Sequence, residues 1–192
     1  TTEYRFLDAD NPDGEFKIIQ PRTRGLEYSV DHFGNDFYIR TNLDALNFKL
    51  VKTPVTATEK ENWVEVIPHR KNVLLEEIDI FRDFLVISER ENGLNKIRIK
   101  RWDNLEDYYL PFESETYTAY TSTNVDFDTT ILRYSYNALN TPASVIDFDM
   151  VSKTKEIKKE QEVLGGRFKK ENYKTERIWA TAEDGTKIPI SF

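Results

Sequence analysis

Strand-like runs of residues recur along this chain at a constant interval. The runs DFYIRTN, DFLVISER and TTILRYSY place Asp36, Asp83 and Thr130 in equivalent positions, two equal steps of 47 residues (83 − 36 and 130 − 83). The same interval separates Pro21 from Pro68, which end the matching runs FKIIQP and WVEVIP. A repeat of about 40 to 50 residues made of several short strands is typical of β-propeller blades, whereas helical repeats need amphipathic helices that are mostly absent here. The interval therefore predicts an all-β chain built from propeller blades.

Each complete repeat divides into four strand-like runs. The first repeat reads LEYSVDHFG, NDFYIRTN, FKLVKTPV and NWVEVIP, and the two that follow have the same plan. Before them, EYRFLDAD and EFKIIQP supply only half of a repeat. We therefore predict a partial β-propeller of about three and a half four-stranded antiparallel blades, with a half blade over residues 1–24 and blades over 25–68, 69–112 and 113–163.

Turn signals separate these runs. Asn92-Gly93 is the strongest hairpin signal, because both residues tolerate the positive φ angles of a two-residue turn. Further turns are predicted near residues 12–14, 34–35 and 184–185. Two Lys/Glu-rich segments have the composition of helix formers, and their apolar spacing does not separate helix from strand. We interpret residues 154–163 as the outer strand of the last blade, because the repeat requires one, and leave residues 168–178 open.

The composition is that of a globular chain. Its 192 residues include 12 Phe, 10 Tyr and 3 Trp, and no apolar run is long enough to span a bilayer. The net charge of −7 argues against nucleic acid or an anionic membrane as a partner. No signal peptide is visible over residues 1–21, and the absence of cysteine fits a reducing compartment, so we expect a cytoplasmic location, with the periplasm as the alternative. Four aromatic residues are predicted to pack between sheets: Phe37, Trp63, Phe84 and Trp102.

The chain contains no recognisable catalytic, metal or cofactor motif. None of its eight serines lies in a Gly-x-Ser-x-Gly elbow, and the two histidines, His32 and His69, lie in the predicted blades, away from any candidate nucleophile. The run DADNPDG resembles a calcium loop, but Gly14 is one position late and Ile19 stands where the bidentate Glu belongs, so a turn is the better interpretation. We therefore expect no catalytic residue, no metal and no cofactor in this chain.

Acidic residues recur in the first strand of the predicted blades. If this strand lines the central channel of the propeller, Glu27, Glu76, Glu77 and Asp79 lie on or beside the channel and attract basic peptides. The simpler alternative is that these carboxylates only solvate strand ends and edges, where charge protects against aggregation.

The C-terminal stretch EVLGGRFKKENYKTERIWATAEDGTKIPIS resembles a junction in the prolyl oligopeptidase family, in its oligopeptidase B branch. There the last propeller blade leads into the first hairpin of an α/β-hydrolase domain. YRFLDADNPDGEFKIIQPR, GLEYSVDHFGNDFYIRTNLDALNFKL and NGLNKIRI resemble later blades of the same proteins, so the resemblance covers essentially the whole chain.

The resemblance implies a seven-bladed ring above a serine peptidase with a Ser, Asp and His triad, which hydrolyses short peptides after Lys or Arg. Residues 164–192 would then be the junction and the first hairpin of the hydrolase domain of the same polypeptide. The partners implied are that domain and short basic peptides, and open blade faces would favour self-association. The alternative from another functional class is a stand-alone β-propeller or β-sandwich module that binds a protein.

Overall fold

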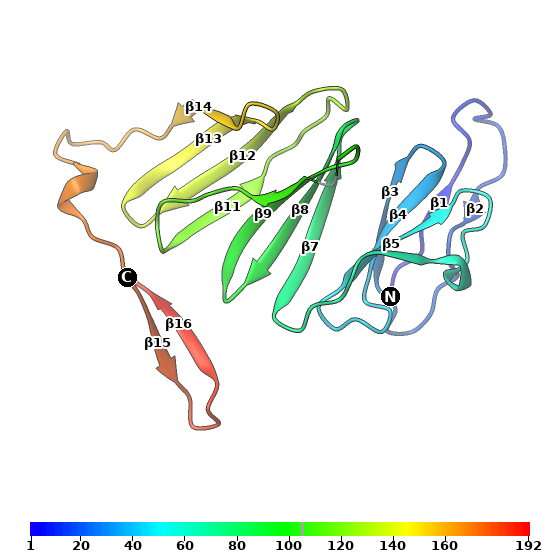
Figure 1. Ribbon diagram of the computed structural model, residues 1–192, viewed down its shortest axis with the longest axis horizontal. Helices are drawn as coiled ribbons and strands as arrows, with labels where there is room; N and C mark the ends of the chain where they lie inside the picture. The colour runs from blue at the N-terminus through cyan, green and yellow to red at the C-terminus, as the bar shows by residue number, and fades with distance from the viewer. Residues whose placement is uncertain (105) are drawn as a thin grey trace. The chain divides into compact units, whose positions relative to one another are not determined.

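Antiparallel sheets make up most of the regular structure among the described residues (Figure 1). The computed structural model describes residues 1–104 and 106–192. Three sheets have four strands, in the orders β3-β4-β5-β6, β10-β9-β8-β7 and β11-β12-β13-β14, and two sheets have two strands, β1-β2 and β15-β16. The predicted all-β class and the partial propeller, with a half blade before three four-stranded blades, are confirmed.

The first compact unit spans Thr1–Ile80. Its elements are β1 (Arg5–Phe6), β2 (Lys17–Ile18), β3 (Tyr28–Phe33), β4 (Asp36–Thr41), β5 (Lys49–Pro54), the 3₁₀ helix η1 (Lys60–Asn62), β6 (Val64–Ile67) and β7 (Val73–Ile80).

The core of this unit lies between the β1-β2 hairpin and one face of the β3–β6 sheet. The Phe6 ring meets the Phe37 ring edge-on, with centroids 4.9 Å apart. Tyr28 donates its hydroxyl hydrogen to the Gln20 carbonyl at 2.7 Å, so its ring is buried without leaving a polar atom unpaired. The half blade is therefore covered on one side by the first complete sheet.

The second compact unit spans Phe81–Phe192. Its elements are β8 (Phe84–Glu91), β9 (Leu94–Arg101), β10 (Asp107–Tyr109), β11 (Tyr117–Thr121), β12 (Ile131–Ala138), β13 (Thr141–Asp149), β14 (Thr154–Glu160), the 3₁₀ helix η2 (Lys170–Asn172), β15 (Arg177–Thr181) and β16 (Lys187–Ser191).

Alternate residues of the strands form the core of the second unit. One face of β8 and β9 packs against one face of β12 and β13, because every second side chain of a strand points to the same side. The residues buried in this way are Phe84, Val86, Ile97, Ile99, Leu132, Tyr134, Ile146 and Phe148. The predicted packing roles of Phe37, Trp63 and Phe84 are confirmed, and half-buried Trp102 donates its ring N–H to the Phe81 carbonyl at 3.1 Å.

The predicted turns occur where their residue types require them. Asn92 and Gly93 have φ angles of 52° and 78°, and Gly34 and Gly185 have φ angles of 62° and 85°. In DADNPDG the Gly14 amide donates to the Asn11 carbonyl at 3.0 Å, which confirms a turn. The two-residue turn between β12 and β13, at residues 139–140, was missed because Leu-Asn lacks the glycine of the pairs that mark two-residue hairpin turns.

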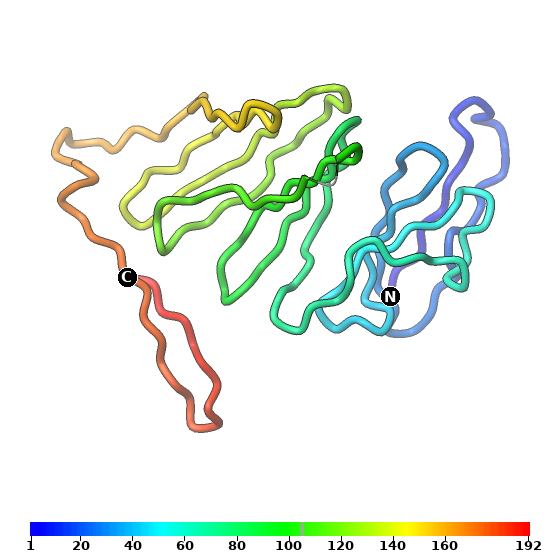
Figure 2. Tube along the Cα trace, viewed as in Figure 1, coloured from blue at the N-terminus to red at the C-terminus, as the bar shows by residue number. Residues whose placement is uncertain are grey.

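The two ambiguous Lys/Glu-rich segments have different outcomes. Residues 154–160 form β14, paired with β13, so the predicted outer strand is confirmed even though its residues are exposed. Residues 168–178, left open in the sequence, contain η2 and the start of β15. Figure 2 follows this connection from β14 to the C-terminal hairpin, in orange and red.

Candidate functional site

The four carboxylates predicted to face a channel lie at the first strands of two sheets. Glu27 directly precedes β3, and Glu76, Glu77 and Asp79 belong to β7. Glu27 and Glu77 are exposed, whereas Glu76 and Asp79 are half-buried. Because successive side chains of a strand point to opposite faces, Glu76 and Glu77 do not share one face of β7. Their part in attracting basic peptides stays a prediction.

Arg40 of β4 lies near these carboxylates. Its Nε atom donates a hydrogen bond to the Leu75 carbonyl oxygen at 2.7 Å, and its guanidinium carbon lies 3.6 Å from the centroid of the Phe48 ring. Burial lowers the pKa of Arg40, and the negative charges of Glu27 and of the two β7 glutamates oppose that shift. Arg40 therefore offsets part of the negative charge around the start of β7.

Sequence reasoning did not find Arg40. Its hydrogen-bond partner is 35 residues further along the chain, so no local pattern marks the contact. Phe48 adopts a φ of 61°, a left-handed conformation that is unusual for an aromatic residue. This backbone conformation accompanies the close approach of the Phe48 ring to the guanidinium, a cation–π geometry.

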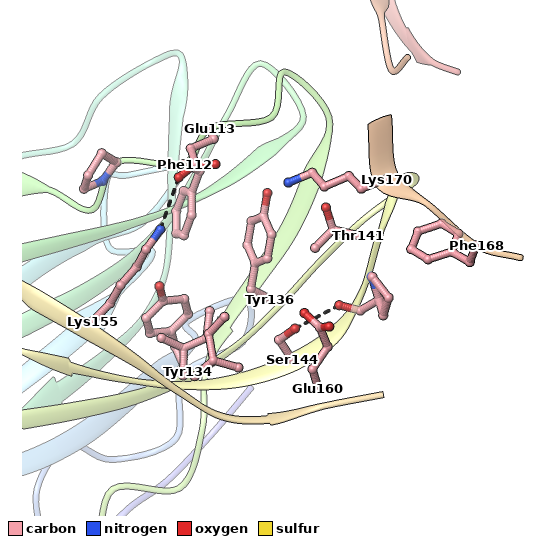
Figure 3. A pocket seen from close by; sticks show the side chains of 14 residues that line it. Phe112, Glu113, Tyr134, Tyr136, Thr141, Ser144, Lys155, Glu160, Phe168 and Lys170 are labelled. Atoms are coloured by element: carbon pink, nitrogen blue, oxygen red, sulfur yellow. Dashed lines mark hydrogen bonds and ion pairs between the residues drawn. The ribbon is translucent and has the colours of Figure 1, made fainter. Parts of the chain in front are cut away.

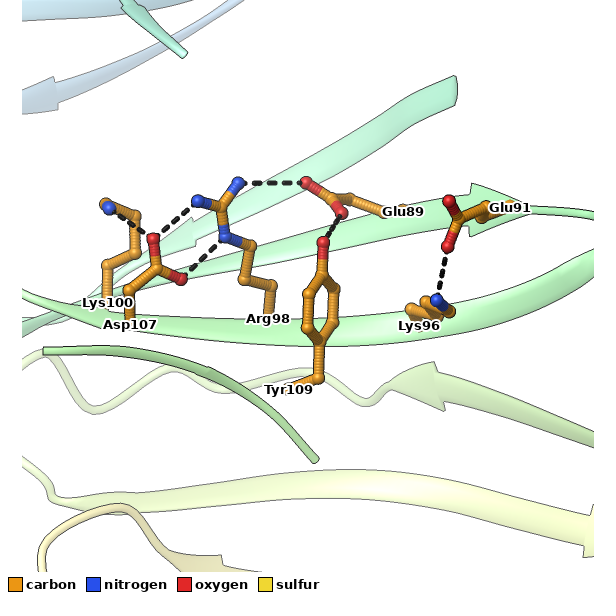
Figure 4. A network of polar contacts seen from close by, with 7 residues as sticks. All are labelled: Glu89, Glu91, Lys96, Arg98, Lys100, Asp107 and Tyr109. Atoms are coloured by element: carbon orange, nitrogen blue, oxygen red, sulfur yellow. Dashed lines mark hydrogen bonds and ion pairs between the residues drawn. The ribbon is translucent and has the colours of Figure 1, made fainter. Parts of the chain in front are cut away.

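A second polar cluster joins β8, β9 and β10 (Figure 4). Asp107 accepts hydrogen bonds from Arg98 Nε and from Lys100 Nζ, each at 2.6 Å. The fully buried carboxylate of Glu89 accepts a hydrogen bond from the Tyr109 hydroxyl at 2.7 Å and lies 3.5 Å from an Arg98 nitrogen. Hydrogen bonding from Arg98 holds the pKa of Asp107 at about 2, although desolvation opposes the shift. These charges are mutually compensated, so we interpret the cluster as a stabilising network across the sheet.

A cavity of about 310 Å³ lies in the second unit, lined by aromatic and polar side chains (Figure 3). The Phe112 ring stacks on Tyr136, with centroids 5.6 Å apart, and Tyr134 and Phe168 also line the cavity. Lys155 pairs with Glu113 at 3.3 Å on its wall.

The chemistry of this cavity is that of a packing site. Burial raises the pKa of Tyr134 to about 12 and also raises the pKa of Tyr136, so both phenols stay protonated at neutral pH. The buried Ser144 hydroxyl donates to the Pro142 carbonyl at 3.0 Å. No signal in the sequence predicted the cavity, because its lining comes from strands and loops that only the fold brings together.

The two histidines have different surroundings. His32 is exposed on β3, with its ring 5.6 Å from the Phe37 ring. His69 follows β6, and its buried Nε2 atom has no hydrogen-bond partner among the residues that the structure describes. Among residues 1–104 and 106–192, no three His, Asp or Glu side chains form a group that could hold a metal ion. Nor does this part of the chain include a helix long and apolar enough to cross a bilayer.

Comparison with known proteins gives a consistent result. Residues 1–161 match the family described as prolyl oligopeptidase, N-terminal beta-propeller domain. Dipeptidyl aminopeptidase BI of Pseudoxanthomonas mexicana is 38% identical over 193 residues, which cover 100% of this chain and 26% of that protein. Protease 2 of Moraxella lacunata is 28% identical over 191 residues, which cover 100% of this chain and 27% of that protein.

A solved structure has the same arrangement of strands. Oligopeptidase B from Leishmania major superimposes with a TM-score of 0.87 at 30% sequence identity, covering 98% of this chain and 28% of that chain. This chain thus spans about a quarter of the length of the relatives it matches.

Proposed function

Because this chain belongs to the prolyl oligopeptidase family, as part of its N-terminal β-propeller domain, we propose that it is part of the propeller of a peptidase that hydrolyses short peptides. The observation that carries this proposal is the match over residues 1–161. The β15-β16 hairpin follows the matched residues, as the first hairpin of a hydrolase domain would. In this proposal the hydrolase domain of the same polypeptide carries a serine nucleophile, and the propeller admits short peptides while excluding folded proteins.

We further propose that the peptidase cleaves after Lys or Arg. The likeness to oligopeptidase B supports this specificity, as do the carboxylates at the first strands of two sheets. A negative channel raises the local concentration of basic peptides through long-range attraction. The charge of Arg40 weakens that attraction, so the electrostatic contribution is smaller than four uncompensated carboxylates would give.

A second candidate is the removal of dipeptides from the amino end of peptides. It is favoured by the 38% identity to a protein named a dipeptidyl aminopeptidase, which is higher than the 30% identity to oligopeptidase B of Leishmania major. The two candidates require different recognition of the substrate amino group. They differ in whether a peptide with a blocked amino terminus is cleaved.

Two fluorogenic substrates separate these candidates in the full-length protein that carries this chain. Both release the dye after Arg, but one has a blocked amino terminus and the other is a free dipeptide. Cleavage of the blocked substrate supports the oligopeptidase, and cleavage of the free dipeptide alone supports the dipeptidyl aminopeptidase. If neither substrate is cleaved, and matched substrates with other residues before the dye are not cleaved either, the proposal that this protein is a peptidase is contradicted. The 192-residue chain is the control, and we expect it to hydrolyse neither substrate.

A further inference from the structure

Arg177, the first residue of β15, reaches a turn far away in the sequence. Its guanidinium donates a hydrogen bond to the carbonyl oxygen of Asn92, in the turn between β8 and β9. The guanidinium carbon also lies 5.1 Å from the centroid of the Trp179 ring, two residues further along the same strand. Arg177 Nε is enclosed and has no hydrogen-bond partner among the described residues, so the side chain can make one more hydrogen bond.

The opposite strand of the hairpin meets the same turn. A Cβ atom added to Gly93 would lie 3.1 Å from Pro189 Cγ of β16 and 3.4 Å from an Arg177 nitrogen. The first distance is shorter than an ordinary van der Waals contact, so the hairpin rests closely on the glycine. Position 93 therefore requires glycine for two reasons: its φ is 78°, and the neighbouring hairpin leaves no room for a Cβ atom.

Two more contacts fasten the segment that leads into β15. The Asn140 side-chain amide donates to the Tyr173 carbonyl at 3.3 Å, and the hydroxyls of Ser114 and Thr175 are 3.3 Å apart. Before these contacts, Gly165 and Gly166 have positive φ angles of 95° and 63°, with no atom of a described residue within 4 Å of an added Cβ. The connection is thus unconstrained at the glycine pair and attached from Tyr173 onward.

We propose that the Asn92-Gly93 turn is a docking surface for the β15-β16 hairpin, and that Arg177 is the residue that holds the hairpin there. A hydrogen bond from a charged donor is stronger than one between neutral groups, and the Trp179 ring keeps the guanidinium in position. This contact fixes the hairpin against the β8-β9 turn, beyond the unconstrained glycine pair. The proposal does not depend on peptidase activity, so kinetic results do not bear on it.

Hydrogen exchange of the hairpin amides in the 192-residue chain tests this docking. An isolated two-stranded hairpin is at best marginally stable in water, so undocking makes the amides of β15 and β16 exchange faster. Arg177→Gln should accelerate their exchange about tenfold, the effect of losing one hydrogen bond to a charged group. Arg167→Gln is the matched control, because Arg167 is an exposed arginine on the same connection, and it should leave the exchange unchanged.

A pair of glycine variants tests the turn itself. Gly34 also has a positive φ in a hairpin turn, but no atom in the described part of the chain lies within 4 Å of an added Cβ, so Gly34→Ala imposes backbone strain without a clash. Gly93→Ala should accelerate hairpin exchange about tenfold, because the added methyl group overpacks the contact with Pro189, and Gly34→Ala should not. Adding Pro189→Ala to Gly93→Ala should restore slow exchange by removing the clashing atom. Equal hairpin exchange in Gly93→Ala and Gly34→Ala, or unchanged exchange in Arg177→Gln, would overturn the proposal.

Discussion

The substitution Asp107→Asn tests whether the charged network on β8, β9 and β10 stabilises the sheet. In the folded chain Asp107 accepts hydrogen bonds from Arg98 and Lys100, and the first of these is the main cause of its low pKa. Asn keeps the shape of the side chain and removes its charge. The two cations would then face a neutral amide, with Glu89 the remaining carboxylate close to Arg98.

The expected effect on stability follows from the pKa of Asp107. A fall from 3.8 in the unfolded chain to about 2 in the folded chain corresponds to at most about 2.5 kcal/mol of stabilisation by the charged form. The side chain retains 28% of its accessible surface, so solvent screening reduces the expected contribution to about 1 kcal/mol. Because folding lowers this pKa, the contribution is complete above pH 4 and disappears as the pH falls through 2.

Urea unfolding followed by tryptophan fluorescence measures this contribution at pH 7 and at pH 2.5. Asp107→Asn should lower the free energy of unfolding by about 1 kcal/mol at pH 7 and by much less at pH 2.5. Asp103→Asn is the control, because Asp103 pairs with Arg101 at 2.9 Å but its side chain is 62% exposed. We expect the control to change stability by less than about 0.5 kcal/mol. The reasoning is refuted if the two variants lose the same stability at pH 7, or if the deficit of Asp107→Asn is undiminished at pH 2.5.

Three further predictions concern the core, a buried phenol and the acidic strand. Leu132→Ala should cost about 2–5 kcal/mol in urea unfolding because Leu132 is fully buried, whereas Leu139→Ala, at a residue 65% exposed, should be nearly neutral. Burial raises the pKa of Tyr134 to about 12, so just above pH 10 absorbance titration should show equal numbers of phenolates in wild type and in Tyr134→Phe. If Tyr134 ionised near pH 10, wild type would show one more. Stability should fall as the pH rises from 10 towards 12. In the full-length protein, replacing Glu76 and Glu77 by Gln should lower kcat/KM for a dibasic peptide at low salt and leave it unchanged at high salt. If the variant and wild type have the same kcat/KM at both salt concentrations, these carboxylates only solvate the strand.

The blades could be predicted from the sequence because their signals are local and repeated. Alternation of apolar residues every second position defines a strand, and the interval of 47 residues aligned even the polar run that forms β14. Asn92-Gly93 marked its hairpin because few residue pairs accept two positive φ angles. The turn at residues 139–140 was missed, since the pairing of β12 with β13 imposes a turn on a Leu-Asn pair that lacks the glycine of the usual two-residue turns.

The sequence predicted only part of the candidate site. The repeat placed Glu27 and the acidic residues of β7 at the first strands, but nothing local indicated that Arg40 would lie near them. The Arg40 contact with Leu75 spans 35 residues, and the Tyr109 contact with the buried Glu89 spans 20. The sequence shows which residues are acidic, whereas the cation that neutralises each of them depends on which strands become neighbours.

The sequence by itself determined the all-β class, the order of the strands and the family, because each depends on local residue patterns, on their recurrence every 47 residues or on a continuous motif. Only the tertiary structure decided what Gly93 and Arg177 do. The turn needs a glycine for its backbone, but its contact with Pro189 exists because the chain returns to it about 100 residues later. Long-range contacts of this kind are set by the packing of whole sheets, to which no short stretch of sequence corresponds.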